Sequence, residues 1–261
     1  MARPLALVTG ASSGIGAAYA VALAARGHDL ILVARRRERL EAVAAPLRAT
    51  GAAVETIVAD LGTRDGVAQI AALCIARPLA LLVNNAGVAH YMPFAQLPPE
   101  RASEVMQVNA VAVLDLSRAA LGGMIERDRG AIINVGSLLA FSGELRGRLP
   151  PRAVYAATKA FLLTFTQALA GELEGTNVKA QVVCPGLVVS EFHTRQGLDL
   201  SAMPRMSSED VVTASLADLD AGVVVCLPPI EDRSALDAIT AAQATLVGQA
   251  SQQALAGRYR A

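Results

Sequence analysis

Short apolar runs alternate with longer segments of helical pattern along this 261-residue chain. The short runs are rich in Leu, Ile and Val, which favours strands, and the segments between them have the length and apolar spacing of helices. This alternation predicts a parallel sheet of about seven strands with helices on both faces, doubly wound through right-handed crossovers. The predicted strands are residues 5–9, 29–34, 54–59, 80–84, 131–135, 178–184 and 223–226. The predicted helices are residues 14–26, 37–50, 64–76, 100–127, 153–174, 208–220 and 234–248.

The chain length suits one large α/β domain. No internal repeat, low-complexity tail or linker divides the sequence, so we expect a single domain over residues 1–261. Two stretches break the alternation, at about 141–152 and about 187–206. Long loops in a compact domain are often functional, so we expect an extended loop in the first stretch and a substrate loop in the second.

Charge and composition exclude several classes of partner. The 23 basic and 23 acidic residues balance, so nothing favours binding to nucleic acid or to an anionic membrane. Each apolar stretch is expected to be too short to span a membrane. The first residues run directly into a predicted strand, which leaves no room for a signal peptide, and we expect a cytoplasmic protein. Cys74, Cys184 and Cys226 are far apart and lack His at ligand spacing, so we expect reduced core cysteines and no metal site.

A glycine-rich turn, TGASSGIG at residues 9–16, joins the first predicted strand to the first helix. Backbone N–H groups and the helix dipole make such a turn an anion site. The first glycine permits the tight turn, the second lets a pyrophosphate approach, and the third lets the helix pack closely on the strand. The alternative is an ordinary tight turn, but the position between strand and helix favours a dinucleotide site. The expected cofactor contacts are Gly10, Ser12, Ser13, Gly14, Ile15 and Gly16.

The end of the second predicted strand indicates which dinucleotide binds. An NAD site places Asp or Glu there to bind the ribose 2′-OH, but this chain has Ala34, followed by Arg35 and Arg36. Without a carboxylate to repel phosphate, and with two guanidinium groups to bind it, the site favours the 2′-phosphate of NADP(H). The alternative is a solvated first helical turn, which is what we expect for Arg37.

Tyr155 and Lys159 share one face of a predicted helix because they lie four residues apart. A free tyrosine has a pKa of about 10, and a neighbouring cation favours its phenolate, which is a way to tune a general acid or base. The pair alone is more often a half-buried Tyr beside a solvated Lys. The other motifs of the chain reverse that preference.

These motifs occur in one register: the glycine turn, NNAG at residues 84–87, Asn109, Ser137, YxxxK at 155–159, and Pro185 with Gly186. In this the chain resembles the short-chain dehydrogenase/reductase family, from Leu5 to about Gly222. The resemblance implies a Rossmann-type fold and a catalytic set of Asn109, Ser137, Tyr155 and Lys159.

By this resemblance, Ser137 would hydrogen-bond the substrate oxygen and Tyr155 would protonate it. Lys159 would bind the nicotinamide ribose and lower the Tyr155 pKa. Asn109 would use a main-chain break and a water to link Lys159 to bulk solvent. The resemblance also implies cofactor contacts at Asp60 and Leu61 for adenine, at Asn85, Ala86 and Gly87, and at Pro185, Gly186, Val188 and Ser190 near the nicotinamide. Ser190 stands where the family usually has Thr.

The spacing departs from the family at one point. Ser137 precedes Tyr155 by more positions than usual, whereas Ser142 has the usual spacing. We prefer Ser137 because it follows a strand-end pattern typical of the family, and the extra residues have the composition of a loop. This loop carries Glu144, Arg146, Arg148 and Arg152, which would either bind an acidic substrate or be solvated; we favour solvation.

The sequence therefore predicts an NADP(H)-dependent carbonyl reductase or alcohol dehydrogenase that acts on a ketone or secondary alcohol with a hydrophobic body. The alternatives are a catalytically silent NADP(H)-binding redox sensor or interaction protein, and a structural α/β domain. The resemblance also implies a homotetramer or dimer through the helices 100–127 and 153–174. The expected pocket residues are Ala89, His90, Tyr91, Leu138, Leu139, Leu187 and Phe192, with the segment up to Met206.

Overall fold

The computed structural model describes residues 3–145, 149–251 and 253–259. Arg146 and Arg148 lie outside these described residues. The chain divides into two compact units, Met1–Pro228 and Pro229–Ala261. The second unit contains α9 (Ser234–Gly248) and a short helical turn, η4 (Gly257–Tyr259). The sheet lies wholly in the first unit, and a single domain over residues 1–261 stays a prediction.

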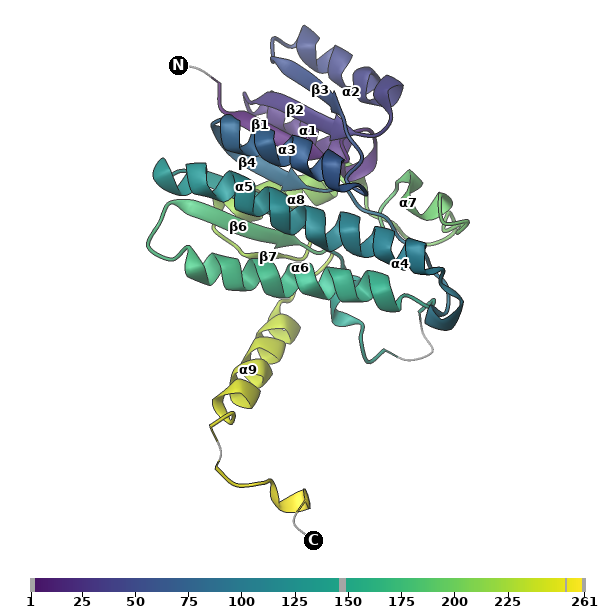
Figure 1. The fold of residues 1–261 in the computed structure, drawn as a ribbon, viewed down its shortest axis with the longest axis vertical. Helices are drawn as coiled ribbons and strands as arrows, with labels where there is room; N and C mark the ends of the chain where they lie inside the picture. Colours follow the sequence, from purple (N-terminus) through teal and green to yellow (C-terminus); the bar gives the residue numbers. More distant parts are fainter. Residues whose placement is uncertain (1–2, 146–148, 252, 260–261) are drawn as a thin grey trace. The chain divides into compact units, whose positions relative to one another are not determined.

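The first unit is built on a seven-stranded parallel sheet in the order β3-β2-β1-β4-β5-β6-β7 (Figure 1). The order reverses direction between β1 and β4, as in a doubly wound sheet. The predicted fold class is confirmed. The strands are β1 (Leu5–Thr9), β2 (Asp29–Ala34), β3 (Val54–Val58), β4 (Leu79–Asn84), β5 (Gly130–Val135), β6 (Val178–Val183) and β7 (Val225–Cys226).

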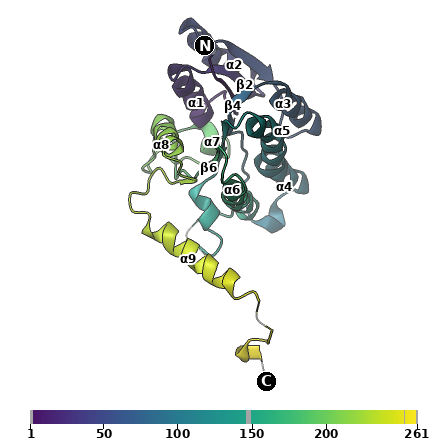
Figure 2. The same ribbon diagram turned by 90° about the vertical axis from the view of Figure 1, so that its left-hand side faces the viewer.

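Helices cover both faces of this sheet, and Figure 2 shows the two layers edge-on. On one face lie α1 (Gly14–Ala25), α2 (Arg37–Ala49) and α8 (Ser208–Asp220). On the other lie α3 (Arg64–Ala76), α4 (Pro99–Met106), α5 (Ala112–Glu126) and α6 (Ala153–Glu172). Each face has its own hydrophobic cluster, because alternate strand residues point to opposite sides: Val8 packs with the first cluster and Leu7 with the second.

The predicted helix over residues 100–127 is not a single regular helix. Between α4 and α5 lies a π-helical turn, η2 (Gln107–Val111), which contains Asn109. By length and mean hydropathy the run Pro99–Glu126 could cross a membrane, so our expectation that every apolar stretch is too short was wrong. Half of its most apolar window is nevertheless buried inside the fold, as in a core helix.

The two predicted loops contain short helical segments that the sequence pattern missed. The substrate loop carries α7 (Glu191–Thr194), and its two ends are joined where Val188 and Met206 form a parallel bridge. A 3₁₀ turn, η3 (Leu138–Phe141), begins the extended loop, and another, η1 (Phe94–Gln96), precedes α4. The three cysteines are buried, as expected for core residues.

Candidate active site

The carboxyl ends of β1, β4, β5 and β6 meet at one edge of the sheet, beside the point where the strand order reverses. Ligands of doubly wound sheets bind in the crevice at that point. Thr9, the last residue of β1, fixes this crevice because its Oγ1 accepts hydrogen bonds from Asn85 N and Ala86 N, each at 3.0 Å. Asn85 Nδ2 returns a bond to Thr9 O at 2.9 Å.

Two cavities open along this crevice, of about 130 Å³ and about 500 Å³, and both are lined by Gly10, Ser13 and Arg195. The smaller cavity is also lined by Ser12, Arg35, Arg36, Asp60, Leu61 and Ala86, among others. The larger is also lined by Gly14, Ile15, Asn85, Gly87, Ser137, Tyr155, Lys159, Pro185, Gly186, Val188 and Ser190, among others. The structure thus brings the expected cofactor and catalytic residues to one elongated crevice, apart from Gly16 and Asn109.

Gly16 lies behind the crevice, in the contact between α1 and the end of β1. A Cβ on this residue would lie 2.4 Å from both Gly10 O and Asn85 Nδ2, which is far inside van der Waals contact. Only glycine therefore allows α1 to start so close to the strand. Gly10 adopts a left-handed backbone conformation, with φ of 66°, which makes the tight turn above it.

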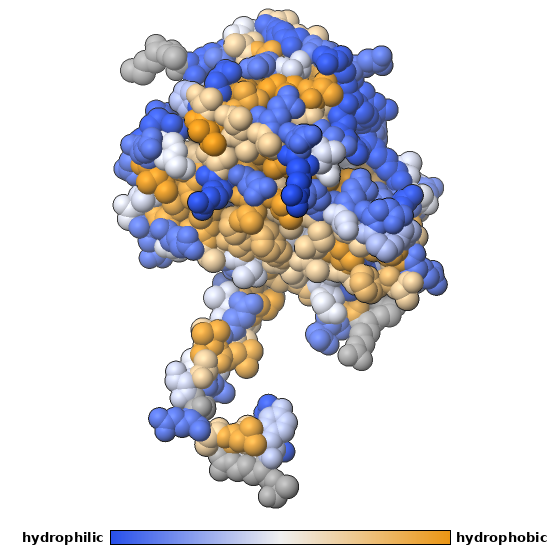
Figure 3. Space-filling view, viewed as in Figure 1, coloured by the Kyte–Doolittle hydropathy of each residue, from blue (hydrophilic) through white to orange (hydrophobic). Residues whose placement is uncertain are grey.

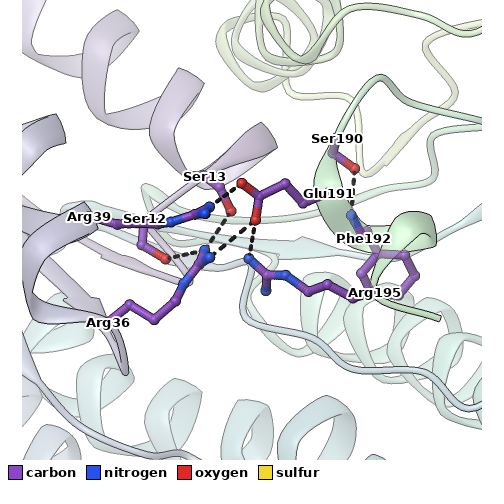
Figure 4. A network of polar contacts seen from close by, with 8 residues as sticks. All are labelled: Ser12, Ser13, Arg36, Arg39, Ser190, Glu191, Phe192 and Arg195. Carbon is purple, nitrogen blue, oxygen red and sulfur yellow. Dashed lines mark hydrogen bonds and ion pairs between the residues drawn. The ribbon is translucent and has the colours of Figure 1, made fainter. Parts of the chain in front are cut away.

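Arg36 links the glycine turn to the start of α2 (Figure 4). Its Nη2 donates to Ser12 Oγ and Ser13 Oγ, each at 3.1 Å. Arg35 is more exposed and lies 3.9 Å from Asp60 Oδ2 and 3.8 Å from Glu104 Oε1. The end of β2 thus presents positive charge to the smaller cavity.

Arg39 and Glu191 complete this charged cluster, and sequence reasoning missed both. Glu191 accepts hydrogen bonds from Arg36, Arg39 and Arg195 (Figure 4). Arg39 lies three residues after Arg36, on the same helix face, so its spacing could have signalled it. The i,i+4 spacing of Glu191 and Arg195 could have signalled their ion pair, but nothing local points to the partners Arg36 and Arg39, which are more than 150 positions away.

Ser137, Tyr155 and Lys159 lie together at the other end of the crevice. Tyr155 and Lys159 come from successive turns of α6, and Ser137 follows β5. The Lys159 ammonium lies 5.5 Å from the centre of the Tyr155 ring and donates to Val135 O at 2.7 Å. Ser137 Oγ accepts a bond from Leu139 N at 3.1 Å, so this serine also caps η3. All three side chains are nine-tenths or more buried, yet they line the cavity.

Burial controls the ionisation of this group. It raises the pKa of Tyr155 well above its ordinary value, while a hydrogen bond with Ser137 opposes the shift. Burial also lowers the pKa of Lys159 to about 8. The phenol is therefore protonated at neutral pH, and burial outweighs the lowering of the Tyr155 pKa that we expected from Lys159.

Asn109 lies beneath the crevice, in the π-helical turn. Its Oδ1 accepts from Val88 N and its Nδ2 donates to Val88 O, both at 2.9 Å. A Cβ on Gly87 would lie 3.5 Å from Asn109 Oδ1 and 3.9 Å from Lys159 Nζ. The glycine therefore leaves open space between the amide and the ammonium.

Ser142 has different neighbours from Ser137. Its Oγ donates to Leu139 O at 2.8 Å and accepts from Arg152 Nε at 2.9 Å, and its side chain is almost fully buried outside the cavity lining. This geometry favours Ser137 as the serine of the site. Arg152 is half-buried and does not line the cavity. It also donates to the backbone oxygens of Ser142, Leu145 and Pro150, so it holds the loop and is only partly solvated.

The wall of the larger cavity is mostly apolar and aromatic. The Tyr91 and Phe192 rings lie 5.6 Å and 5.8 Å from the Tyr155 ring. Two of the expected pocket residues do not line it: Ala89 is fully buried, and His90 Nε2 pairs with Glu104 at 2.9 Å. Its other lining residues include Leu138, Leu139, Leu149, Pro150, Leu187, His193, Leu198, Leu200 and Met203.

The comparison with known families agrees with this geometry. The model of the short chain dehydrogenase family matches residues 4–200. The chain is a short-chain dehydrogenase/reductase. The resemblance first seen in the motifs is thereby confirmed, and the chain belongs to an oxidoreductase family.

Solved structures of this family resemble the chain closely. The short-chain dehydrogenase from Sphingobium yanoikuyae in complex with NADPH is 36% identical, with a TM-score of 0.93 over 98% of this chain and 100% of that one. The bulky-bulky ketone specific alcohol dehydrogenase from Comamonas testosteroni is 30% identical, with a TM-score of 0.90 over the whole of both chains.

The very-long-chain 3-oxoacyl-CoA reductase of Mycosarcoma maydis is 36% identical over 193 residues. These residues are 72% of this chain but only 54% of that protein. The chain thus matches about half the length of this reductase, so the likeness supports the chemistry of the family more than a shared substrate.

Proposed function

We propose that this protein is an NADP(H)-dependent reductase of ketones with a bulky apolar body, and that it oxidises the corresponding secondary alcohols. The observation that carries the proposal is one crevice that joins an arginine-lined nucleotide end to an apolar cavity bearing Ser137, Tyr155 and Lys159. The Sphingobium enzyme with NADPH and the Comamonas enzyme for bulky-bulky ketones support the choice of cofactor and of substrate class.

The crevice fits the dinucleotide. The glycine turn would hold the pyrophosphate at the start of α1, and Arg35 and Arg36, with Arg39 on the same helix as further positive charge, would hold the 2′-phosphate. Asp60 and Leu61 line the adenine end, while Gly186 and Ser190 line the opposite end beside Tyr155. Bound NADPH would supply a hydride to the carbonyl carbon.

The residues of the chain would then manage the substrate oxygen. Ser137 Oγ would hydrogen-bond that oxygen and orient it toward the Tyr155 hydroxyl. The Tyr155 phenol, protonated at neutral pH because burial raises its pKa, would donate its proton to the oxygen. Lys159 would provide a buried positive charge that stabilises the phenolate left behind.

The test is NADPH and NADH oxidation with a panel of diaryl, aryl-alkyl and small aliphatic ketones, run with wild type and Tyr155→Phe. We expect turnover of bulky ketones with NADPH and its loss in the variant, while NADPH still binds. Turnover that survives in Tyr155→Phe refutes the role of the phenol. NADPH binding without turnover of any ketone favours the silent sensor instead.

We also propose that the protein forms a homo-oligomer through α4, α5 and α6. Apolar side chains are exposed along these helices, including Met106, Leu114, Ile125 and Phe161, and Figure 3 shows apolar surface in this region. Light scattering on the purified protein would test this, and a monomer would refute it. A cytoplasmic location stays a prediction.

A further inference from the structure

Glu191, the first residue of α7, ties the substrate loop to the start of α2 (Figure 4). One carboxylate oxygen accepts from Arg36 Nη1 at 3.1 Å and from Arg195 Nη2 at 2.5 Å. The other oxygen accepts from Arg39 Nη1. Arg36 lines the nucleotide end of the crevice and Arg39 follows it on α2, whereas Glu191 and Arg195 belong to the substrate loop.

The guanidinium group of Arg36, which would bind the 2′-phosphate, therefore already holds a carboxylate, and so does that of Arg39 beside it. Carboxylates and phosphates present oxygen acceptors to the same edge of a guanidinium group, so the two anions compete for it. Arg36 is also held in place from the other side, because its Nη2 donates to Ser12 and Ser13. It can change its anionic partner without leaving the glycine turn.

We propose that Glu191 is a built-in competitor of the 2′-phosphate, so that this residue sets the preference between NADP(H) and NAD(H) and frees the substrate loop when NADP(H) binds. The inference rests on the function proposed above. The exchange of Glu191 for the 2′-phosphate requires no change in the sheet or in the glycine turn.

The charges favour such an exchange. Three guanidinium groups share one carboxylate, and a phosphate monoester with a charge of about −1.5 to −2 neutralises them better. Hydrogen bonds from Arg195, Arg39 and Arg36 lower the pKa of Glu191 to about 2, so the carboxylate stays charged at physiological pH. The Glu191 side chain is 43% exposed, and ion pairs this exposed are weak enough to exchange.

The exchange reaches the substrate cavity through the next two residues. Phe192 packs 5.8 Å from the Tyr155 ring, and the His193 ring stacks on Tyr91 at 6.3 Å. The loop ends are fastened separately, since Val189 N donates to Met206 O and Met206 N donates to Leu187 O, both at 2.9 Å. Release of Glu191 therefore loosens α7 and its aromatic residues while the base of the loop stays in place.

The experiment measures the dissociation constants of NADPH and NADH by calorimetry for wild type and Glu191→Gln. These nucleotides differ only in the 2′-phosphate, so their ratio isolates the proposed competition. We expect NADPH to bind about tenfold more tightly to the variant, because it no longer has to replace the three exposed ion pairs of Glu191. NADH binding should change less than about twofold because it displaces no carboxylate.

Asp199→Asn is the matched control, because it removes one exposed carboxylate from the same loop and keeps an oxygen that can accept the bond from Ser201 N. This control should leave the NADPH-to-NADH ratio unchanged. An equal rise in NADPH affinity in both variants would show a general charge effect and overturn the proposal. An unchanged or weaker preference for NADPH over NADH in Glu191→Gln would also overturn it, although wild type that prefers NADPH would still support the proposed function.

Hydrogen exchange over residues 190–198 of the free protein gives a second readout. We expect faster exchange in Glu191→Gln than in wild type, and equal exchange would contradict a fastening role. Wild type that binds neither nucleotide would overturn the proposed function, and this inference with it.

Discussion

Replacing Lys159 with Met should change how the stability of the free protein depends on pH. Burial lowers the pKa of Lys159 from 10.5 to about 8, so the unfolded chain binds more protons than the folded protein between these values. The buried ammonium thus costs stability in full below pH 8, and the cost is lost as pH rises toward 10.5. From these two pKa values, about 2 kcal/mol of the cost disappears between pH 7 and pH 9.5. Wild type should gain that amount relative to Lys159→Met.

Urea unfolding of both proteins without cofactor, followed by circular dichroism at several pH values, measures this difference. The comparison must be between proteins, because burial also raises the pKa of Cys184 to about 11, which removes stability as pH rises above the ordinary cysteine value. Wild type and variant share most of that loss, and the rest has the same sign as the expected difference, because the Lys159 ammonium lowers the Cys184 pKa in wild type alone. The bond from Lys159 to Val135 O is absent from the variant at every pH, and a neutral amine can still donate it in wild type, so it adds a nearly constant offset.

The chain contains only two lysines, and the exposed Lys179 is the matched control. Lys179→Met should show no comparable gain. Lysine labelled at Cε should give two carbon resonances, one of which titrates near pH 8. A constant difference between wild type and Lys159→Met over this range would refute the argument that burial controls the site.

Three further substitutions test the structure around the crevice. Arg152→Met removes four hydrogen bonds that hold the extended loop, which should cost about 1.5–3 kcal/mol of local loop stability. We therefore expect KM to rise for bulky ketones more than for small ones. An equal rise in KM for both kinds of ketone would contradict this. Gly16→Ala places a Cβ 2.4 Å from Gly10 O and should lower the free energy of unfolding by about 1–3 kcal/mol. Gly87→Ala makes only ordinary contacts, of 3.5 Å and 3.9 Å, and should change the free energy of unfolding by less than about 0.5 kcal/mol. It should nevertheless weaken NADPH binding. Thermal unfolding and calorimetry separate the two effects, and full NADPH affinity in Gly87→Ala would show that the space beside Lys159 is not used.

The sequence predicted the fold because the signals for its elements are local. All seven strands and the helices from α1 to α9 were found within a few residues, apart from α7 and the division of the long helix into α4, η2 and α5. The π-helical turn changes only the hydrogen-bond register of an otherwise helical segment, so apolar periodicity cannot reveal it. The family resemblance alone implied a main-chain break at Asn109.

Sequence reasoning predicted the candidate site less well where side chains from different segments of the chain pair with one another. The motifs brought Ser137, Tyr155 and Lys159 to one place, but not the pairing of Arg152 with Ser142 or of Glu191 with three arginines. His90 was expected at the substrate and instead pairs with Glu104. Apart from Arg195, which lies four residues after Glu191, each partner is set by tertiary packing, which spacing along the chain does not encode.

The same short helix, α7, contributes to both ends of the crevice. Glu191 contacts the arginines at the nucleotide end, and the next residue, Phe192, forms part of the wall beside Tyr155. A helix of four residues is too short to let these two side chains move independently. If Glu191 competes with the 2′-phosphate as we propose, selection of the cofactor phosphate and shaping of the substrate cavity are mechanically coupled through α7. Substitutions in α7 chosen to alter the ketone preference should also shift the NADPH-to-NADH ratio, whereas substitutions at Leu149 on the opposite wall should not.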